Sequence, residues 1–64
     1  MTLSRRELEV LEQMACGLTA TEDGAARHYS WNTIRWHRAR IRRKLGARNN
    51  AHAVAIGFRT GLLR

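Results

Sequence analysis

The first stretch of the chain repeats apolar residues at the spacing of an α-helix. These residues are Leu8, Val10, Leu11, Met14 and Ala15. Just before them, Ser4 and Glu7 form a capping box, because a hydroxyl and a glutamate three residues later can satisfy free backbone amides. Gly17 follows as a left-handed cap. The pattern predicts a helix over residues 5–16.

A second, shorter helix is predicted to run to about residue 28, with Thr19 or Thr21 as its N-cap. Its apolar residues are few, namely Ala25, Ala26 and Tyr29. Gly24 lies inside this segment and costs about 1 kcal/mol relative to alanine. The pattern is therefore the weakest of the four helical patterns in the chain.

A third, longer helix is predicted between an N-cap at Ser30 and a closing glycine at Gly46. Its inward positions follow helical spacing at Ile34, His37 or Arg38, Ile41 and Leu45. Because most of the remaining residues between the caps are polar or charged, the helix is expected to be exposed on its other side.

A fourth helix is predicted to begin at Asn49 or Asn50 and to stop at Gly61. It places on one side Ala53, Val54, Gly57 and Phe58. After it, Leu62 and Leu63 can fold back as an apolar plug. Four helices with short connections and no strand pattern predict an all-α fold, with a three-helix core and a C-terminal helix.

The length of 64 residues permits one domain, residues 1–64, with a thin core. A domain of this size buries only about 60% of the surface that its unfolded chain exposes, so its stability is expected to be marginal. It has no room for a deep substrate pocket.

The charge of +7 is distributed unevenly along the chain. Residues 1–23 carry two arginines against five acids, a net charge of −3. Residues 24–64 carry ten basic residues and no acid, a net charge of +10. A one-sided cationic field of this kind attracts a polyanion.

Enzymatic and metal-binding functions find no support in the residues. Cys16, the single cysteine, permits no disulfide within the chain and is expected to be a buried thiol at a helix end. No spacing typical of a metal site or a catalytic triad occurs among His28, His37 and His52. We expect no cofactor, no small-molecule ligand and no catalysis. No apolar run approaches the ~20 residues of a membrane span, and no signal peptide is visible, so a cytoplasmic location is expected.

The order of the predicted helices is that of a helix-turn-helix motif, with the turn near Tyr29 and Ser30. The longer helix has no acid between its caps, and it carries six cations: Arg35, Arg38, Arg40, Arg42, Arg43 and Lys44. A helix that needs only solubility normally mixes charges to gain pairs between successive turns. Six like charges repel one another, and nucleic-acid phosphates would offset that cost. The expected partner is double-stranded DNA.

The outward, N-terminal part of this helix is the part that a recognition helix inserts into the major groove. It presents Trp31, Asn32, Arg35, Trp36 and Ala39. Arg35 can read guanine with two hydrogen bonds, Asn32 can read adenine or bond a phosphate, and Ala39 permits close approach to a thymine methyl. Further along, the residues suited to phosphates are Arg42, Arg43 and Lys44, and Arg40 is counted with them as DNA-binding.

An ordered set of residues runs along the chain without gaps. It consists of Leu3-Ser4-Arg5-Arg6-Glu7, Val10-Leu11, Gly17-Leu18-Thr19, Glu22, Ser30, Thr33-Ile34-Arg35, His37, Ile41, Lys44-Leu45-Gly46-Ala47-Arg48, Ala53-Val54 and Gly61-Leu62-Leu63. In this combination the chain resembles the LuxR-type (GerE-type) helix-turn-helix domain, the DNA-binding output of many bacterial response regulators. No single piece is decisive, but the combination is specific.

The resemblance implies further roles. It places at base edges Arg35, Trp36 and Ala39. It places near the DNA backbone or the groove edge Thr21, Asn32, Thr33 and Arg43. In the family the fourth helix commonly forms a two-fold dimer contact, for which the candidates here are Asn50, Ala53, Val54 and Gly57. His37 is implied to be a structural residue.

Three residues depart from the family pattern. Asp23 and Arg27 stand where the family usually has an aliphatic residue and a leucine, so the second helix is expected to be loosely packed, shifted in register or stabilised in another way. An exposed Asp23–Arg27 pair would contribute only about 0.3–0.5 kcal/mol. Trp36 has three interpretations, which are DNA contact, a protein interface and packing on the scaffold. For Trp31 the simplest interpretation is packing beside Tyr29.

The leading hypothesis is a sequence-specific transcriptional regulator that binds an inverted repeat as a homodimer. The chain is expected to be either a stand-alone LuxR-type protein of bacterial or phage origin, located on the nucleoid, or a fragment of a larger regulator. Met1 directly before the domain favours the stand-alone protein. The alternative is a small protein-interaction module on the same fold, which docks on RNA polymerase or another regulator. The salt dependence of binding separates the two, because only phosphate contacts release counterions.

Overall fold

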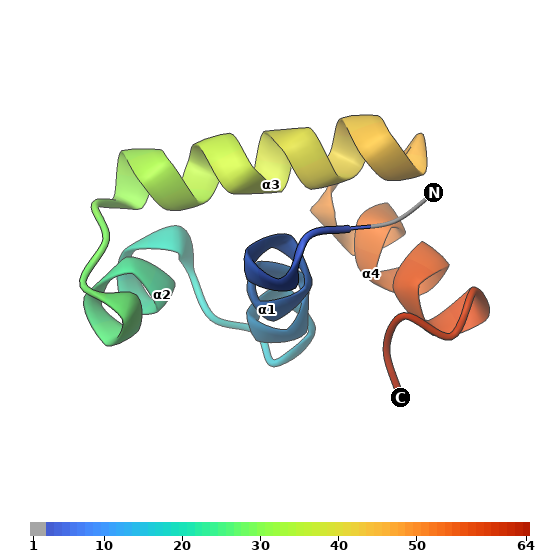
Figure 1. Ribbon diagram of the computed structural model, residues 1–64, viewed down its shortest axis with the longest axis horizontal. Helices are drawn as coiled ribbons and strands as arrows, with labels where there is room; N and C mark the ends of the chain where they lie inside the picture. The colour runs from blue at the N-terminus through green and yellow to red at the C-terminus, as the bar shows by residue number, and fades with distance from the viewer. Residues whose placement is uncertain (1–2) are drawn as a thin grey trace.

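The computed structural model describes residues 3–64, except for the side chains of residues 26 and 27. This part of the chain contains four helices, namely α1 (Arg5–Ala15), α2 (Ala20–Arg27), α3 (Trp31–Leu45) and α4 (Asn50–Arg59) (Figure 1). No strand occurs among the described residues. The predicted all-α fold is confirmed.

Side-chain caps fix the start of every helix. Ser4 accepts a hydrogen bond from the Glu7 backbone N–H at 3.2 Å, and the Glu7 carboxylate accepts one from the Ser4 N–H at 2.8 Å. Thr19 and Glu22 form a second capping box at the start of α2, which decides between the two candidate caps. Ser30 caps α3 as predicted, and α4 is capped by Asn49.

Helix α3 lies across the other three helices, which all stand on one side of it (Figure 1). The core between them consists of Leu3, Val10, Leu11, Ile34, Ile41, Ala53 and Leu63. The two isoleucines of α3 are fully buried, as predicted, and Leu63 folds back onto the core as the predicted plug. The opposite side of α3 is thereby left free.

Helix α2 packs tightly despite its poor apolar content. An added Cβ on Gly24 would lie only 2.5 Å from the carbonyl oxygen of Tyr29, so this glycine lets α2 approach the turn before α3. Asp23, one of the departures from the family pattern, is fully buried. Loose packing of α2 is therefore not observed. The predicted pairing of Asp23 with Arg27 falls on a side chain outside the described residues.

The prediction that Cys16 is a buried thiol is wrong, because the residue is exposed. Cys16 is the C-cap of α1, whereas the buried face of this helix consists of Glu7, Val10 and Leu11. At 100° per residue, position 16 points well away from Leu11. Ala15, also expected on the apolar side, is exposed as well.

Candidate nucleic-acid interface

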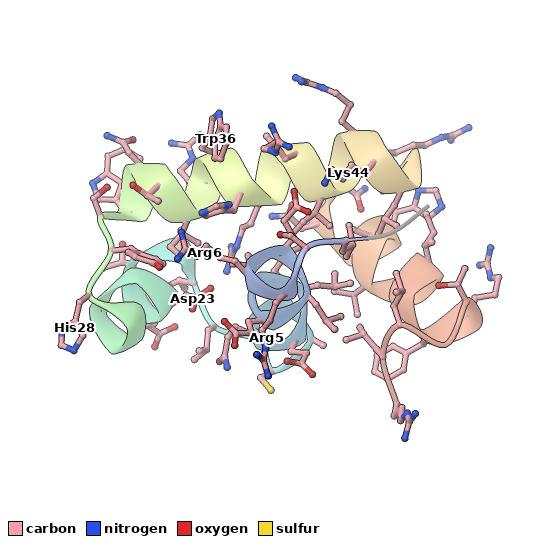
Figure 2. All side chains as sticks on the ribbon, viewed as in Figure 1. Arg5, Arg6, Asp23, His28, Trp36 and Lys44 are labelled. Atoms are coloured by element: carbon pink, nitrogen blue, oxygen red, sulfur yellow. The ribbon has the colours of Figure 1, made fainter. Side chains whose placement is uncertain are left out.

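The free side of α3 presents most of the residues predicted to meet DNA bases. Asn32, Arg35 and Trp36 are exposed, and Ala39 in the middle of α3 is half-buried. Figure 2 shows Trp36 pointing away from the body of the molecule. A helix of 15 residues is about 22 Å long, and a helix of this kind fits a major groove about 12 Å wide.

Two arginines of α3 stack on the two exposed tryptophans. The Arg35 guanidinium lies 5.3 Å from the ring centroid of Trp31, and that of Arg40 lies 5.0 Å from the ring of Trp36. The rings of Trp36 and His37 also pack edge to face, with their centroids 5.1 Å apart. Trp36 nevertheless remains 56% exposed, so most of its surface is free for a ligand.

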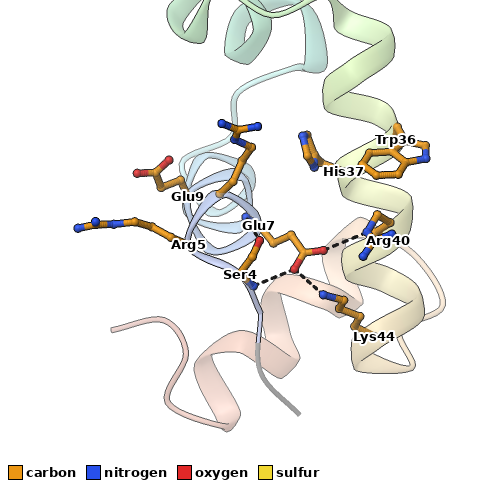
Figure 3. Close-up of a pocket in the computed structure, with 9 residues that line it drawn as sticks. Ser4, Arg5, Glu7, Glu9, Trp36, His37, Arg40 and Lys44 are labelled. Carbon is orange, nitrogen blue, oxygen red and sulfur yellow. Dashed lines mark hydrogen bonds and ion pairs between the residues drawn. The ribbon is translucent and has the colours of Figure 1, made fainter.

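One flank of α3 is tied to α1 by Glu7. Glu7 is only 3% exposed. Its carboxylate accepts hydrogen bonds from Lys44 Nζ at 2.7 Å and from Arg40 Nε at 3.3 Å (Figure 3). Burial raises the pKa of this carboxyl, but the bonds from Lys44, the Ser4 backbone and Arg40 outweigh it and lower the pKa to about 2. Two of the cations predicted to meet phosphates therefore have an internal counterion.

The other predicted groove-edge residues lie at separate places. Thr21 is exposed in the first turn of α2. Thr33 is half-buried, and its hydroxyl is 3.0 Å from that of Ser30, so it helps to cap α3. Arg43 is exposed on the free side of α3. Arg42 donates a hydrogen bond to the side-chain oxygen of Asn50 at the start of α4.

The predicted dimer residues of α4 face in different directions. Ala53 is fully buried in the chain's own core, and Gly57 is buried close to Leu63 and Leu11. Asn50 is engaged by α3 as described, while Val54 is half-buried. Val54 is thus the apolar member of this set that a second chain could reach.

Sequence reasoning placed Arg38 among the cations of α3 but gave it no role. The residue is only 9% exposed, and its Nη2 donates to the backbone carbonyl of Leu18 at 2.8 Å. The helical spacing had left His37 or Arg38 as the inward residue, and both are buried. A signal for a buried arginine was therefore present in the sequence.

Other kinds of site are not found in the part of the chain that the structure describes. No cluster of three or more His, Cys, Asp or Glu side chains there is arranged to hold a metal ion. Within the same residues, no helix has the length and apolarity needed to cross a membrane.

A basic helix held outward by a helix-turn-helix scaffold defines a DNA-binding domain as the class of this protein. Over residues 1–56 the chain matches the family described as bacterial regulatory proteins, luxR family, and it belongs to that family.

Several curated relatives resemble the chain along most of its length. It is 36% identical over 61 residues to the uncharacterized transcriptional regulatory protein YxjL of Bacillus subtilis, covering 95% of this chain and 28% of that protein. It is 42% identical over 57 residues to the transcriptional activator protein BjaR1 of Bradyrhizobium diazoefficiens, covering 89% and 24%. It is 37% identical over 59 residues to the transcriptional activator protein PhzR of Pseudomonas fluorescens, covering 86% and 24%. The chain thus spans about a quarter of the length of these relatives.

Proposed function

We propose that this chain binds double-stranded DNA sequence-specifically as a transcriptional regulator, with α3 in the major groove. The observation that carries the proposal is the free side of α3, where Arg35, Trp36 and Arg43 are exposed. Membership of the luxR family supports it. We propose that the chain has no catalytic activity and that it acts on DNA in the cytoplasm.

The roles of the individual residues follow from their positions. Arg35 reads a guanine through O6 and N7, and Asn32, one turn closer to the N-terminus, reads an adenine or bonds a phosphate. Trp36 covers a thymine methyl or a sugar, because a half-exposed aromatic ring gains most from an apolar contact. Ala39 lets the helix approach the base edges closely.

Contacts outside the base edges fix the helix in the groove. Arg43 and Thr21 bind the DNA backbone, since both are exposed near the ends of the contact surface. Thr33 remains at the groove edge. Arg40 and Lys44 add positive potential next to the groove, and each exchanges part of its contact with Glu7 for a phosphate when DNA is bound.

We further propose that two copies bind an inverted repeat. One α3 reads only a few base pairs, and two-fold related helices about 34 Å apart read successive major-groove faces. The accessible part of α4, centred on Val54, is the proposed contact between the copies.

Selection of bound duplexes from a random pool at physiological salt tests this proposal. We expect enrichment of a short motif that recurs as an inverted repeat. With about six phosphate contacts, affinity for the selected duplex should fall a thousand-fold or more between 50 and 200 mM salt. If no duplex is retained at low salt, DNA binding is disproved. In that case docking on RNA polymerase or another regulator through Trp36 becomes the better explanation.

A further inference from the structure

A groove of about 530 Å³ lies beside α3, where α2 and α4 both begin. We call it the basic groove, and define it by Ala20 of α2, Asn50 of α4, and Asn32, Arg35, Arg38 and Arg42 of α3. The three arginines are spaced at i, i+3 and i+7, so they lie along one strip of the helix. The groove therefore concentrates positive charge next to the surface proposed to enter the DNA.

The charges of this strip have no carboxylate partner among the described residues. On the opposite flank of α3, Glu7 holds Arg40 and Lys44 in ion pairs of 3.3 and 2.7 Å. Within the basic groove, Arg35 stacks on an indole ring and Arg42 donates to a neutral amide oxygen. The two flanks of α3 thus differ, since Glu7 partly neutralises one and no ion pair neutralises the other.

Arg38 is the innermost side chain of the basic groove. It is nine-tenths buried, and its Nη2 donates a hydrogen bond to the carbonyl of Leu18, while its Nε has no hydrogen-bond partner. A guanidinium keeps its charge at any physiological pH. A buried charge without a counterion is costly to the fold, because burial removes hydration that no paired carboxylate replaces. The geometry therefore calls for an anion at this place.

The beginning of α4 adds to the positive potential. Asn50 is the first residue of α4, and the first turn of this helix contains no acidic residue. By contrast, the first turn of α2 contains Glu22 and Asp23. The start of α4 is therefore capped by the neutral Asn49 and carries no negative charge, so its dipole still favours an oxyanion on the side of the groove.

We propose that the basic groove binds one phosphodiester group of the DNA backbone, with Arg38 as its buried anchor. Arg42 and the start of α4 complete the site, and Arg35 at its mouth remains free to reach a base edge. This inference rests on the proposed DNA-binding function and deepens it. A phosphate held by a buried group fixes the position of α3 along the duplex, which exposed arginines alone would fix less firmly.

The replacement Arg38→Met tests the site, because methionine keeps much of the volume and removes the buried charge. Binding to the selected duplex and to a random duplex of equal length would be followed by fluorescence anisotropy from 50 to 200 mM salt. We expect the slope of log affinity against log salt to become shallower by about 0.9 on both duplexes. Affinity at 100 mM salt should fall about ten-fold, as for the loss of one charge-assisted bond.

Arg59→Met is the matched control, since it removes an exposed arginine in the last turn of α4. Its slope should stay within about 0.2 of the wild-type value, because Arg59 lies outside every surface proposed to contact a phosphate. Circular dichroism checks that each variant is folded. If Arg38→Met does not fold, Arg42→Met replaces it under the same slope criterion.

A second measurement locates the phosphate. Single methylphosphonate linkages, which lack the charge, would be placed one by one along the selected duplex. We expect one position in each half-site where the wild type loses affinity and Arg38→Met loses none further. An unchanged salt slope in the groove variants, or equal losses for both proteins at every linkage, would overturn the phosphate site while DNA binding stands. Failure of the wild type to retain any duplex would instead overturn the proposed function itself.

Discussion

At the scale of single residues, Glu7 separates the cations on the two flanks of α3. Arg40 and Lys44 lie on its side and are partly neutralised, whereas Arg35, Arg38 and Arg42 lie on the other. Removal of a cation from the first group would also leave a buried carboxylate with fewer donors, so it would affect folding as well as binding. Residues of the second group are the better probes of DNA contact.

The replacement Arg35→Ala should weaken binding to the selected duplex by about 1–3 kcal/mol and relax the base preference at one position. Arg35 is exposed and its stacking on Trp31 does not support the core, so the fold should be unaffected. Competition binding with duplexes that vary this base pair measures the effect, with Arg59→Ala as control. Equal losses on selected and random duplexes would show that Arg35 reads no base.

The low pKa of Glu7 predicts an acid-sensitive fold. Its pKa is about 2 in the folded chain against an ordinary value of 4.5, so folding favours the ionised carboxylate. The resulting stabilisation, about 3 kcal/mol, is complete above pH 5 and is lost as the pH falls towards 2. Urea unfolding of the wild type should show this loss between pH 5 and pH 2.

In Glu7→Gln the same pH dependence should be largely absent, and the free energy of unfolding at pH 7 should be lower by a similar amount. Glu12→Gln is the control, since it removes an exposed carboxylate from the same helix. If Glu7→Gln kept the acid-dependent loss of the wild type, the stabilisation would come from another group.

At the scale of helices, α2 shows where local sequence and packing disagree. Its start could be recognised from Thr19 and Glu22, because a capping box is a local signal. Helix propensity counts Gly24 against the helix, yet the close approach of the Tyr29 carbonyl requires a residue without a Cβ there. That requirement arises from the packing of α2 on the turn before α3, which propensity does not contain.

The replacement Gly24→Ala should therefore destabilise the fold by about 1–3 kcal/mol through overpacking, although alanine raises the helix propensity by about 1 kcal/mol. Chemical unfolding measures the change, and Thr21→Ala on the exposed face of α2 should stay within about 0.5 kcal/mol of the wild type. An equal or higher stability for Gly24→Ala would mean that α2 moves away from the turn at little cost.

Helix α3 shows the same division between local and distant information. Ser30 and Gly46 predicted its ends correctly, since caps act within a few residues, and Gly46 has a left-handed φ of 68°. The partner of Lys44 is Glu7, 37 positions earlier, and no pattern along the helix points to it. Sequence reasoning therefore predicted which residues are cationic and outward, but not which of them already have a counterion.

At the scale of the whole molecule, function and stability compete within a very small body. It measures 29 × 20 × 19 Å, and its longest helix serves both as part of the core and as the proposed DNA-binding surface. The buried charge of Arg38 and the cationic flank beside it both lower the stability of the free fold. Bound DNA would offset both charges. At a free DNA concentration [L] and a dissociation constant Kd, the free energy of unfolding should rise by RT ln(1 + [L]/Kd).

The proposed pairing of two copies on DNA can be tested through α4. Ala53 and Gly57 are buried within the chain itself, so the proposed contact between copies through α4 is centred on Val54 and its exposed neighbours. The replacement Val54→Glu places a charge in that contact. It should reduce the preference for an inverted repeat over a single half-site at least ten-fold, while half-site affinity stays close to that of the charge-matched control Thr60→Glu. Sedimentation on both duplexes supplies the stoichiometry. If Val54→Glu keeps the full preference at a stoichiometry of two, the copies meet through another surface or cooperate only through the DNA.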